Sequence, residues 1–287
     1  MEQTSSIKIL DKTLRLLSLF GSESPEWGVT EMSDHSGLPK STVYRILRVL
    51  LKHEFLAQDP VSKRFRLGLG ALELGHHAYQ GLDLRDFALP VLSAAAEKSG
   101  ETVTLQVLNQ SRDRVVCIER VQQSSGLHLI MDIGNTAPLH AGASSRALLA
   151  FMPDEEIEVV LSSALEALTP HTIISPEQLR TELQQVRDNG YAVSFEETDL
   201  GAAGVAVPIF DARGAAVASI TIAGPVTRLN RETYAKYAEL AIEAAATIIR
   251  AQGLRQVFHA KPATAEPGLT EQSAPTRATR ASASITI

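Results

Sequence analysis

The chain has 287 residues, 44% of them hydrophobic and 21% charged, with a net charge of −6, which is ordinary for a soluble protein of two domains. No apolar run approaches the length of a membrane span, and the first residues lack the pattern of a signal peptide, so we expect a cytoplasmic protein. The only cysteine, Cys117, excludes an intramolecular disulfide and a thiolate metal cluster, and we expect no metal and no cofactor.

The first predicted elements are two short helices. Leucines at helical spacing predict a helix over residues 7–20, which Gly21 ends. Thr30 is a suitable N-cap for a second helix over residues 31–36.

A third helix begins near Pro39, which fits the first turn of a helix. Its apolar stripe is formed by Val43, Ile46, Leu47 and Leu50. Its other side carries basic and hydroxyl side chains, those of Lys40, Ser41, Thr42, Tyr44, Arg45 and Arg48. One face of this helix therefore packs in the core, and the other can bind a ligand.

Residues 55–67 predict two strands joined by a turn around Asp59-Pro60. The return strand is basic at its tip, with Lys63, Arg64 and Arg66. Two short helices, a basic third helix and a basic hairpin predict a winged helix-turn-helix, whose recognition helix enters the major groove of DNA.

Basic residues on one helix face are often an ordinary solvated surface, so the distribution of charge along the chain is needed to tell such a surface from a DNA-binding face. Residues 40–66 carry seven basic and two acidic side chains, a local charge of +5 in an acidic chain. Such a patch attracts phosphates. We therefore expect Arg45 and Arg48 to read bases and the hairpin to bind phosphates.

The segment from Trp27 to Arg66 resembles the DNA-binding half of the IclR family of bacterial transcriptional regulators. The motif Gly-Leu-Pro-Lys-Ser-Thr-Val-Tyr-Arg-Ile-Leu, beginning at Gly37, carries the resemblance, and the order of elements agrees across about residues 7–80. It implies a repressor or activator whose second domain senses a small molecule.

The second domain is predicted to be α+β, with helices around a six-stranded, largely antiparallel sheet. Its expected strands are residues 102–108, 114–121, 127–131, 191–194, 205–210 and 216–223. Its expected helices are residues 84–99, one through 146–151, one starting at 154, one over 176–189 and a closing helix over about 231–254.

This half resembles the GAF-like effector domain of the same family, through Gly-Tyr-Ala-Val-Ser-Phe-Glu-Glu-Thr-Asp-Leu-Gly from Gly190 and the stretch around Pro208. By position, the resemblance implies an effector site at Leu129, Ala143, Ser144, Ser194, Gly204, Thr221 and Ala223. Small residues there would equally suit tight packing of a helix on a sheet.

The expected effector is a small organic acid. A helix that begins near Ser145 would offer N–H groups without intrahelical partners to an anion. Arg146 stands where the family tends to have lysine, and Gly204 replaces a small polar residue or cysteine, which widens the site and favours a bulkier, aromatic acid.

An enzyme is the main alternative, but its signals are weak. Ser144 and Ser145 lie near His140, yet no Gly-x-Ser-x-Gly elbow is present. Glu196 and Glu197 are interpreted as a solvated turn rather than an acid–base pair. A competing hypothesis is an enzyme or ligand carrier that uses the second domain, with the first serving only association.

The expected domains are a DNA-binding domain (1–67), a linker helix (68–82), an effector domain (83–258) and a disordered tail (259–287) rich in Pro, Ser, Thr and Ala. A homodimer would place two recognition helices on inverted half-sites of double-stranded operator DNA. The family resemblance further implies pairs of dimers through the effector domains.

Overall fold

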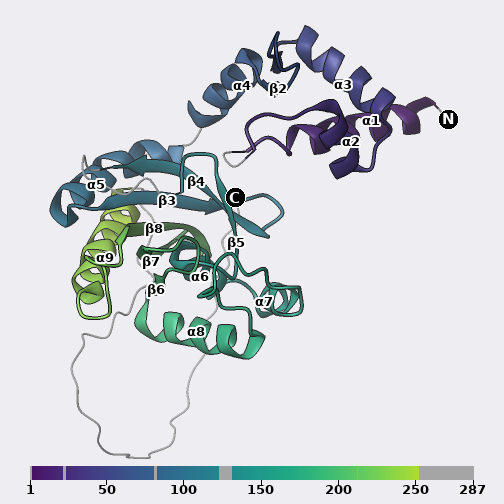
Figure 1. Cartoon of the computed structure of the whole chain (residues 1–287). Coiled ribbons are helices and arrows are strands. Elements are labelled where there is room, and N and C mark those ends of the chain that lie inside the picture. The colour runs from purple at the N-terminus through teal and green to yellow at the C-terminus, as the bar shows by residue number, and fades with distance from the viewer. Residues whose placement is uncertain (1, 22–23, 81–82, 123–130, 212, 252–287) are drawn as a thin grey trace, which may run out of the picture. The chain divides into compact units, whose positions relative to one another are not determined.

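The computed structural model describes residues 2–21, 24–80, 83–122, 131–211 and 213–251 (Figure 1). Its N-terminal elements are α1 (Glu2–Leu17), α2 (Val29–Ser36), α3 (Lys40–Lys52), β1 (Leu56–Gln58), β2 (Phe65–Leu67) and α4 (Leu69–Gln80). Helices α2 and α3 followed by a two-stranded hairpin confirm the predicted winged helix-turn-helix.

The apolar stripe of α3 forms the centre of the N-terminal core. Val43, Ile46, Leu47 and Leu50 are all buried, as predicted, and they pack with Leu16, Met32, Leu56 and Phe65. Each large aliphatic side chain contributes about 1.5–3 kcal/mol when fully buried. This stripe therefore fixes which face of α3 points to solvent.

Helix α2 begins earlier than predicted, and Thr30 is not its N-cap. The N-cap is Gly28, whose N–H donates to Glu31 Oε2 at 2.9 Å, and the Met32 N–H donates to the Gly28 carbonyl at 3.0 Å. Because the side chain of Glu31 satisfies a backbone N–H at the helix start, the first turn forms without a hydroxyl cap.

A third segment joins the β1–β2 hairpin, which the sequence did not indicate. The Trp27 N–H donates to the Phe65 carbonyl at 2.9 Å, and the Phe65 N–H donates to the Trp27 carbonyl at 2.8 Å. The chain just before α2 is thereby fixed to the hairpin.

Two glycines allow the start of α4 to approach the end of α3. A Cβ at Gly68 would lie 2.2 Å from the Glu54 carbonyl oxygen, and one at Gly70 would lie 2.9 Å from the His53 carbonyl oxygen. These neighbours are backbone atoms, which cannot rotate away. The glycines predicted only as breaks are therefore required for packing.

Gly68→Ala should destabilise the N-terminal domain by at least about 1 kcal/mol, because the added methyl group overpacks backbone against backbone. Gly75→Ala is the matched control. Nothing lies within 4 Å of a Cβ at Gly75, which is inside α4, so that change should be neutral or stabilising. Urea unfolding followed by circular dichroism measures both, and equal stabilities would contradict the close approach.

The C-terminal sheet has six strands in the order β5-β4-β3-β8-β7-β6, and every neighbouring pair is antiparallel. The strands are β3 (Thr102–Leu108), β4 (Arg114–Val121), β5 (Thr136–Pro138), β6 (Ala192–Phe195), β7 (Ala202–Phe210) and β8 (Ala216–Pro225). The predicted α+β fold is confirmed.

One predicted strand differs. Residues 127–131 lie outside the described residues except for Met131, which belongs to no strand. The edge beside β4 is formed by β5, where Val115 pairs with Ala137. A three-residue strand is too short to show alternation, so no local signal indicated it.

The helices cover both faces of the sheet (Figure 1). Helices α5 (Asp83–Ser99) and α9 (Tyr234–Ala251) pack on one face, and α6 (Ala143–Leu149) lies on the other, with α7 (Asp154–Leu161) and α8 (Pro176–Asn189) beyond it. Within the described ranges, no helix has the length and apolar character needed to cross a membrane.

Candidate DNA interface and effector site

The face of α3 opposite the core is open to solvent. Lys40, Ser41, Tyr44, Arg45 and Arg48 are exposed, and Thr42 is half-buried. Within the described part of the chain, the guanidinium groups of Arg45 and Arg48 have no hydrogen-bond or ion-pair partner. These donors are therefore available to an external ligand.

The turn between β1 and β2 forms a rigid wing. Asp59 Oδ1 accepts hydrogen bonds from the N–H groups of Val61 and Ser62, at 3.0 and 2.6 Å, and from the Ser62 hydroxyl at 2.9 Å. These hydrogen bonds lower the pKa of Asp59, and the bond from the Ser62 N–H has the largest effect. Lys63 has a left-handed backbone, φ 59°.

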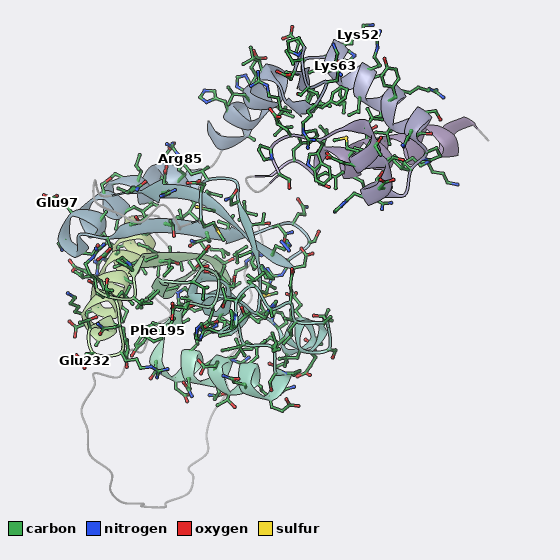
Figure 2. The ribbon with its side chains drawn as sticks, in the orientation of Figure 1. Lys52, Lys63, Arg85, Glu97, Phe195 and Glu232 are labelled. Carbon is green, nitrogen blue, oxygen red and sulfur yellow. The ribbon has the colours of Figure 1, made fainter. Side chains whose placement is uncertain are left out.

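The basic side chains of the wing differ in their surroundings. Lys63 and Arg66 are exposed, and Figure 2 labels Lys63 together with Lys52, also exposed, at the last residue of α3. Both wing cations are open to a phosphate.

Arg64 pairs with Glu31 of α2, and the two side chains are 39% and 48% exposed. Its two terminal nitrogens donate to the two Glu31 carboxylate oxygens at 3.0 and 2.8 Å, and the second also donates to the Glu26 carbonyl at 2.9 Å. The hydrogen bond from Arg64 lowers the pKa of Glu31. Arg64 therefore links the wing to α2 through an exposed ion pair, which adds little stability and which a phosphate can displace.

Five of the predicted effector residues meet between α6 and the sheet. A Cβ at Gly204 would lie 3.4 Å from Thr221 Cγ2 and 3.8 Å from the Cβ atoms of Ala143 and Ala223. Ser194 pairs directly with Gly204 across β6 and β7 and is buried. Side chains from α6, β6, β7 and β8 thus converge, as the resemblance implies.

The remaining two effector residues behave differently. Ser144 is buried in α6, and its carbonyl accepts a hydrogen bond from the Ser219 hydroxyl at 3.2 Å. Leu129 lies outside the described residues.

The same face carries two buried polar side chains, Thr104 and Gln106, that sequence reasoning missed. The Thr221 hydroxyl donates to Gln106 Oε1 at 3.1 Å, and Gln106 Nε2 donates to Thr104 Oγ1 at 2.6 Å. All three are at most 6% exposed. A sequence pattern could have revealed them, because the polar residues of β3 alternate with Val103 and Leu105, which face α5 and α9. We name Thr104, Gln106 and Thr221 the polar row.

Glu197 corrects an expectation: it is 6% exposed, so it does not lie on a solvated turn. Both Arg146 terminal nitrogens bind the Glu197 carboxylate, one of them at 2.7 Å, and the same nitrogen donates to the Val193 carbonyl at 2.6 Å. Glu197 also accepts from the Gly142 N–H at 3.4 Å.

This ion pair changes the argument about an anion at α6. The carboxylate of Glu197 already lies at the beginning of the helix, beside Gly142, and would repel a second carboxylate there. The Gly142 N–H at the start of α6 is therefore already occupied by a carboxylate of the protein.

The enzyme alternative, based on Ser144 and Ser145 near His140, finds no support from the surroundings of His140. Its Nε2 is hydrogen-bonded to the Glu166 carbonyl at 2.9 Å. Among the described residues, no group of His, Cys, Asp and Glu side chains could hold a metal ion. Burial raises the pKa of Cys117 to about 12, which keeps that thiol protonated and unreactive near neutral pH.

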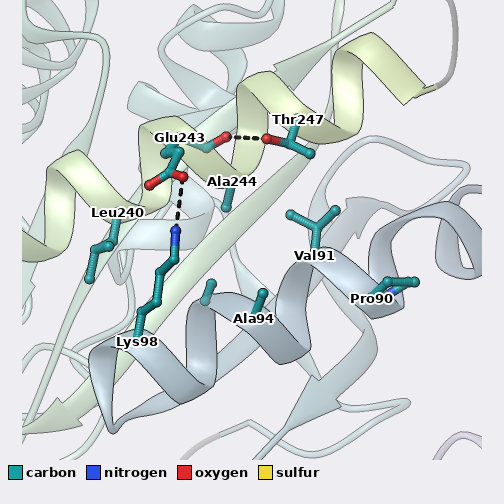
Figure 3. A pocket seen from close by; sticks show the side chains of 9 residues that line it. Pro90, Val91, Ala94, Lys98, Leu240, Glu243, Ala244 and Thr247 are labelled. Carbon is teal, nitrogen blue, oxygen red and sulfur yellow. Dashed lines mark hydrogen bonds and ion pairs between the residues drawn. The ribbon is translucent and has the colours of Figure 1, made fainter.

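A shallow groove of about 260 Å³ lies between α5 and α9, on the other face of the sheet (Figure 3). Its walls are mostly apolar, from Val91, Ala94 and Leu240, and its charged groups, Lys98 and Glu243, bind each other at 2.9 Å. It offers no buried polar group for an acid, so the α6 face is the better candidate.

Two family models match the chain. The model described as "IclR helix-turn-helix domain" covers residues 9–60, and "Bacterial transcriptional regulator IclR C-terminal" covers residues 76–250. The chain is 31% identical over 251 residues to the transcriptional repressor IclR of Escherichia coli K12, covering 87% of this chain and 92% of that protein. It is 34% identical to the HTH-type transcriptional regulator KdgR of Dickeya chrysanthemi, covering 86% and 80%.

Solved structures agree with these relatives. An IclR transcriptional regulator from Alicyclobacillus acidocaldarius aligns with a TM-score of 0.75 at 28% identity, covering 86% of this chain and 99% of that one. An IclR homolog from Microbacterium hydrocarbonoxydans, complexed with 4-hydroxybenzoate, aligns with a TM-score of 0.71 at 26% identity, covering 85% and 98%.

Proposed function

This chain belongs to the IclR family of bacterial transcriptional regulators, and we propose that it is a homodimer that binds operator DNA under the control of a small organic acid. The observation that carries the proposal is α3, whose apolar side is buried and whose polar side is open to solvent. Because bacterial operator DNA lies in the cytoplasm, we propose that the protein acts there.

In this proposal α3 enters the major groove. Arg45 and Arg48 read guanine edges, because a guanidinium can donate two hydrogen bonds to one guanine. The neighbouring contacts come from Lys40, Ser41, Thr42 and Tyr44. Lys63 and Arg66 of the wing bind phosphates, and Arg64 positions the wing through Glu31.

Exposed apolar side chains on two helices support a homodimer. On α1 they are Ile9, Leu10 and Leu14, and on α4 they are Leu69, Leu72 and Leu74, each at least 43% exposed. Such side chains favour association of two copies. A two-fold dimer presents its recognition helices to inverted half-sites, and we propose that effector domains pair such dimers.

The effector is proposed to bind beside the residues that meet at Gly204. The relative from Microbacterium hydrocarbonoxydans was solved with 4-hydroxybenzoate, an aromatic acid, which supports the same ligand class here. The acid changes DNA affinity only as far as it prefers one arrangement of the domains.

Gly204→Leu should lower the affinity for the acid at least tenfold while operator binding survives. A leucine would occupy the space between Thr221, Ala143 and Ala223, whereas the alanine of the control Gly204→Ala stays in ordinary contact. Calorimetry with a panel of aliphatic and aromatic monocarboxylates measures the affinity, and a gel shift measures operator binding.

If Gly204→Leu binds the acid with unaltered affinity, the site lies elsewhere. If the full chain binds a small molecule but shifts no DNA, the enzyme or carrier alternative is correct. Residues 259–287 lie outside the described residues. We predict that deleting them affects neither the affinity for the acid nor operator binding.

A further inference from the structure

We propose that the carboxylate of the effector is bound by Arg120 of β4, at the end of the polar row, and that the acid extends from there toward Gly204. This inference rests on the proposed function, because it names the cation and the length of the ligand for that same site. In this inference Arg120, rather than the start of α6, binds the carboxylate of the ligand, because the carboxylate of Glu197 already lies at the start of α6.

The strand register places Arg120 beside the polar row. Arg120 pairs with Thr104 across β4 and β3, and Thr104 pairs with Thr221 across β3 and β8. Directly paired residues of antiparallel strands point to the same face of the sheet. Since Thr221 contacts the Gly204 position on the α6 side, Arg120 belongs to the α6 side as well.

On the strands of this face, two buried polar atoms lack partners among the described residues. One is Arg120 Nε, and the other is the hydroxyl of Thr102, a residue only 1% exposed. Thr102 pairs with Ala223, so its side chain lies on the face of the effector residues. A buried hydroxyl and a buried N–H without acceptors are uncommon in native proteins. A ligand carboxylate would satisfy both kinds of donor.

The present partner of Arg120 resembles a stand-in for such a carboxylate. One terminal nitrogen of Arg120 binds Asp132 Oδ1, and the other donates to Gln122 Oε1 at 2.9 Å. The Arg120 side chain is 11% exposed but that of Asp132 is 64% exposed. An ion pair with an exposed carboxylate adds little stability, so a ligand can displace it.

The other buried arginine of the site is not available. Arg146 binds Glu197 with both terminal nitrogens, and Glu197 is itself buried. Displacing that carboxylate would leave a buried charge without a partner, which is costly. Arg120 is therefore the cation that an incoming acid can reach.

The spacing of the strands also selects the size of the acid. Arg120 on β4 and Gly204 on β7 are separated by three strand spacings, roughly 14 Å at about 4.8 Å per spacing, and Gly204 lies two residues along β7 from Ala206, the residue in line with Arg120. A two-carbon acid bound at Arg120 would not reach Gly204, whereas an aromatic monocarboxylate would cover the polar row.

The test compares three variants of the full chain by calorimetry. The probes are benzoate, 4-hydroxybenzoate, phenylacetate and their uncharged amides. Arg120→Gln should weaken the best-bound acid at least tenfold and abolish the preference for the acid over its amide. Asp132→Asn should tighten the same acid, because it removes the competing carboxylate. Arg114→Gln, on the same strand but hydrogen-bonded to Thr136 at 3.2 Å, should leave the affinity unchanged.

The outcomes separate this inference from the proposed function. An acid that binds the original chain and Arg120→Gln equally, or an Asp132→Asn variant that binds no more tightly, overturns Arg120 as the counter-ion and leaves the proposed function intact. If no acid of the panel binds the original chain while the operator gel shift succeeds, the aromatic-acid effector and this inference both fail.

Discussion

Arg146→Ala is expected to destabilise the C-terminal domain by about 3–5 kcal/mol, because it leaves the buried carboxylate of Glu197 without its cation. The arginine is 1% exposed and fixes α6 to the end of β6 through Glu197 and the Val193 carbonyl. Urea unfolding of the full chain, followed by far-UV circular dichroism, measures the loss.

Arg180→Ala is the matched control for this variant. Arg180 also binds a glutamate through two nitrogens, Glu158 at 2.6 and 2.9 Å, but both side chains are more than half exposed. An exposed pair contributes about 0–1 kcal/mol. Arg146→Lys should lose less than Arg146→Ala, since the charge stays and only the two-pronged geometry is lost. Equal stabilities of Arg146→Ala and Arg180→Ala would show that burial of the pair has no energetic consequence.

Arg45→Ala should weaken specific operator binding by about 1–3 kcal/mol and relax the preference at one base position. Arg45 is exposed on the face of α3 opposite the buried stripe, so the change removes the proposed DNA contact without disturbing the core. A titration against a set of singly mutated operators measures both the affinity and the preference.

The control for Arg45→Ala removes the same charge elsewhere. Arg213 lies in the turn between β7 and β8 and is 87% exposed, so Arg213→Ala should leave the operator affinity unchanged. If Arg45→Ala retains both its affinity and its preference at every base, α3 does not read the operator through this residue.

Patterns that are local in sequence predicted the fold well. The stripe of α3 repeats within a few residues, and the long strands β3, β4, β7 and β8 alternate or carry β-branched residues. The polar alternation of β3 was visible, but its meaning depends on α6, which covers that face from another part of the chain.

The sequence could not predict the contacts between distant residues. Arg64 and Glu31 are 33 residues apart, and Arg146 and Glu197 are 51 apart. Whether a charged side chain is a surface group or a buried partner depends on which segment folds against it. The sequence therefore indicated a solvated Glu197, which the fold buries, and it could not show that Arg64, predicted as a phosphate contact, has Glu31 beside it.

The central claim is most directly tested by a fluorescence anisotropy titration of the full chain with the duplex that flanks its own gene, in competition with an unrelated duplex of equal length. We predict that the first duplex is bound about a thousandfold more tightly or better, with an affinity that falls steeply as salt rises. Equal affinity for the two duplexes at every salt concentration would contradict a sequence-specific regulator.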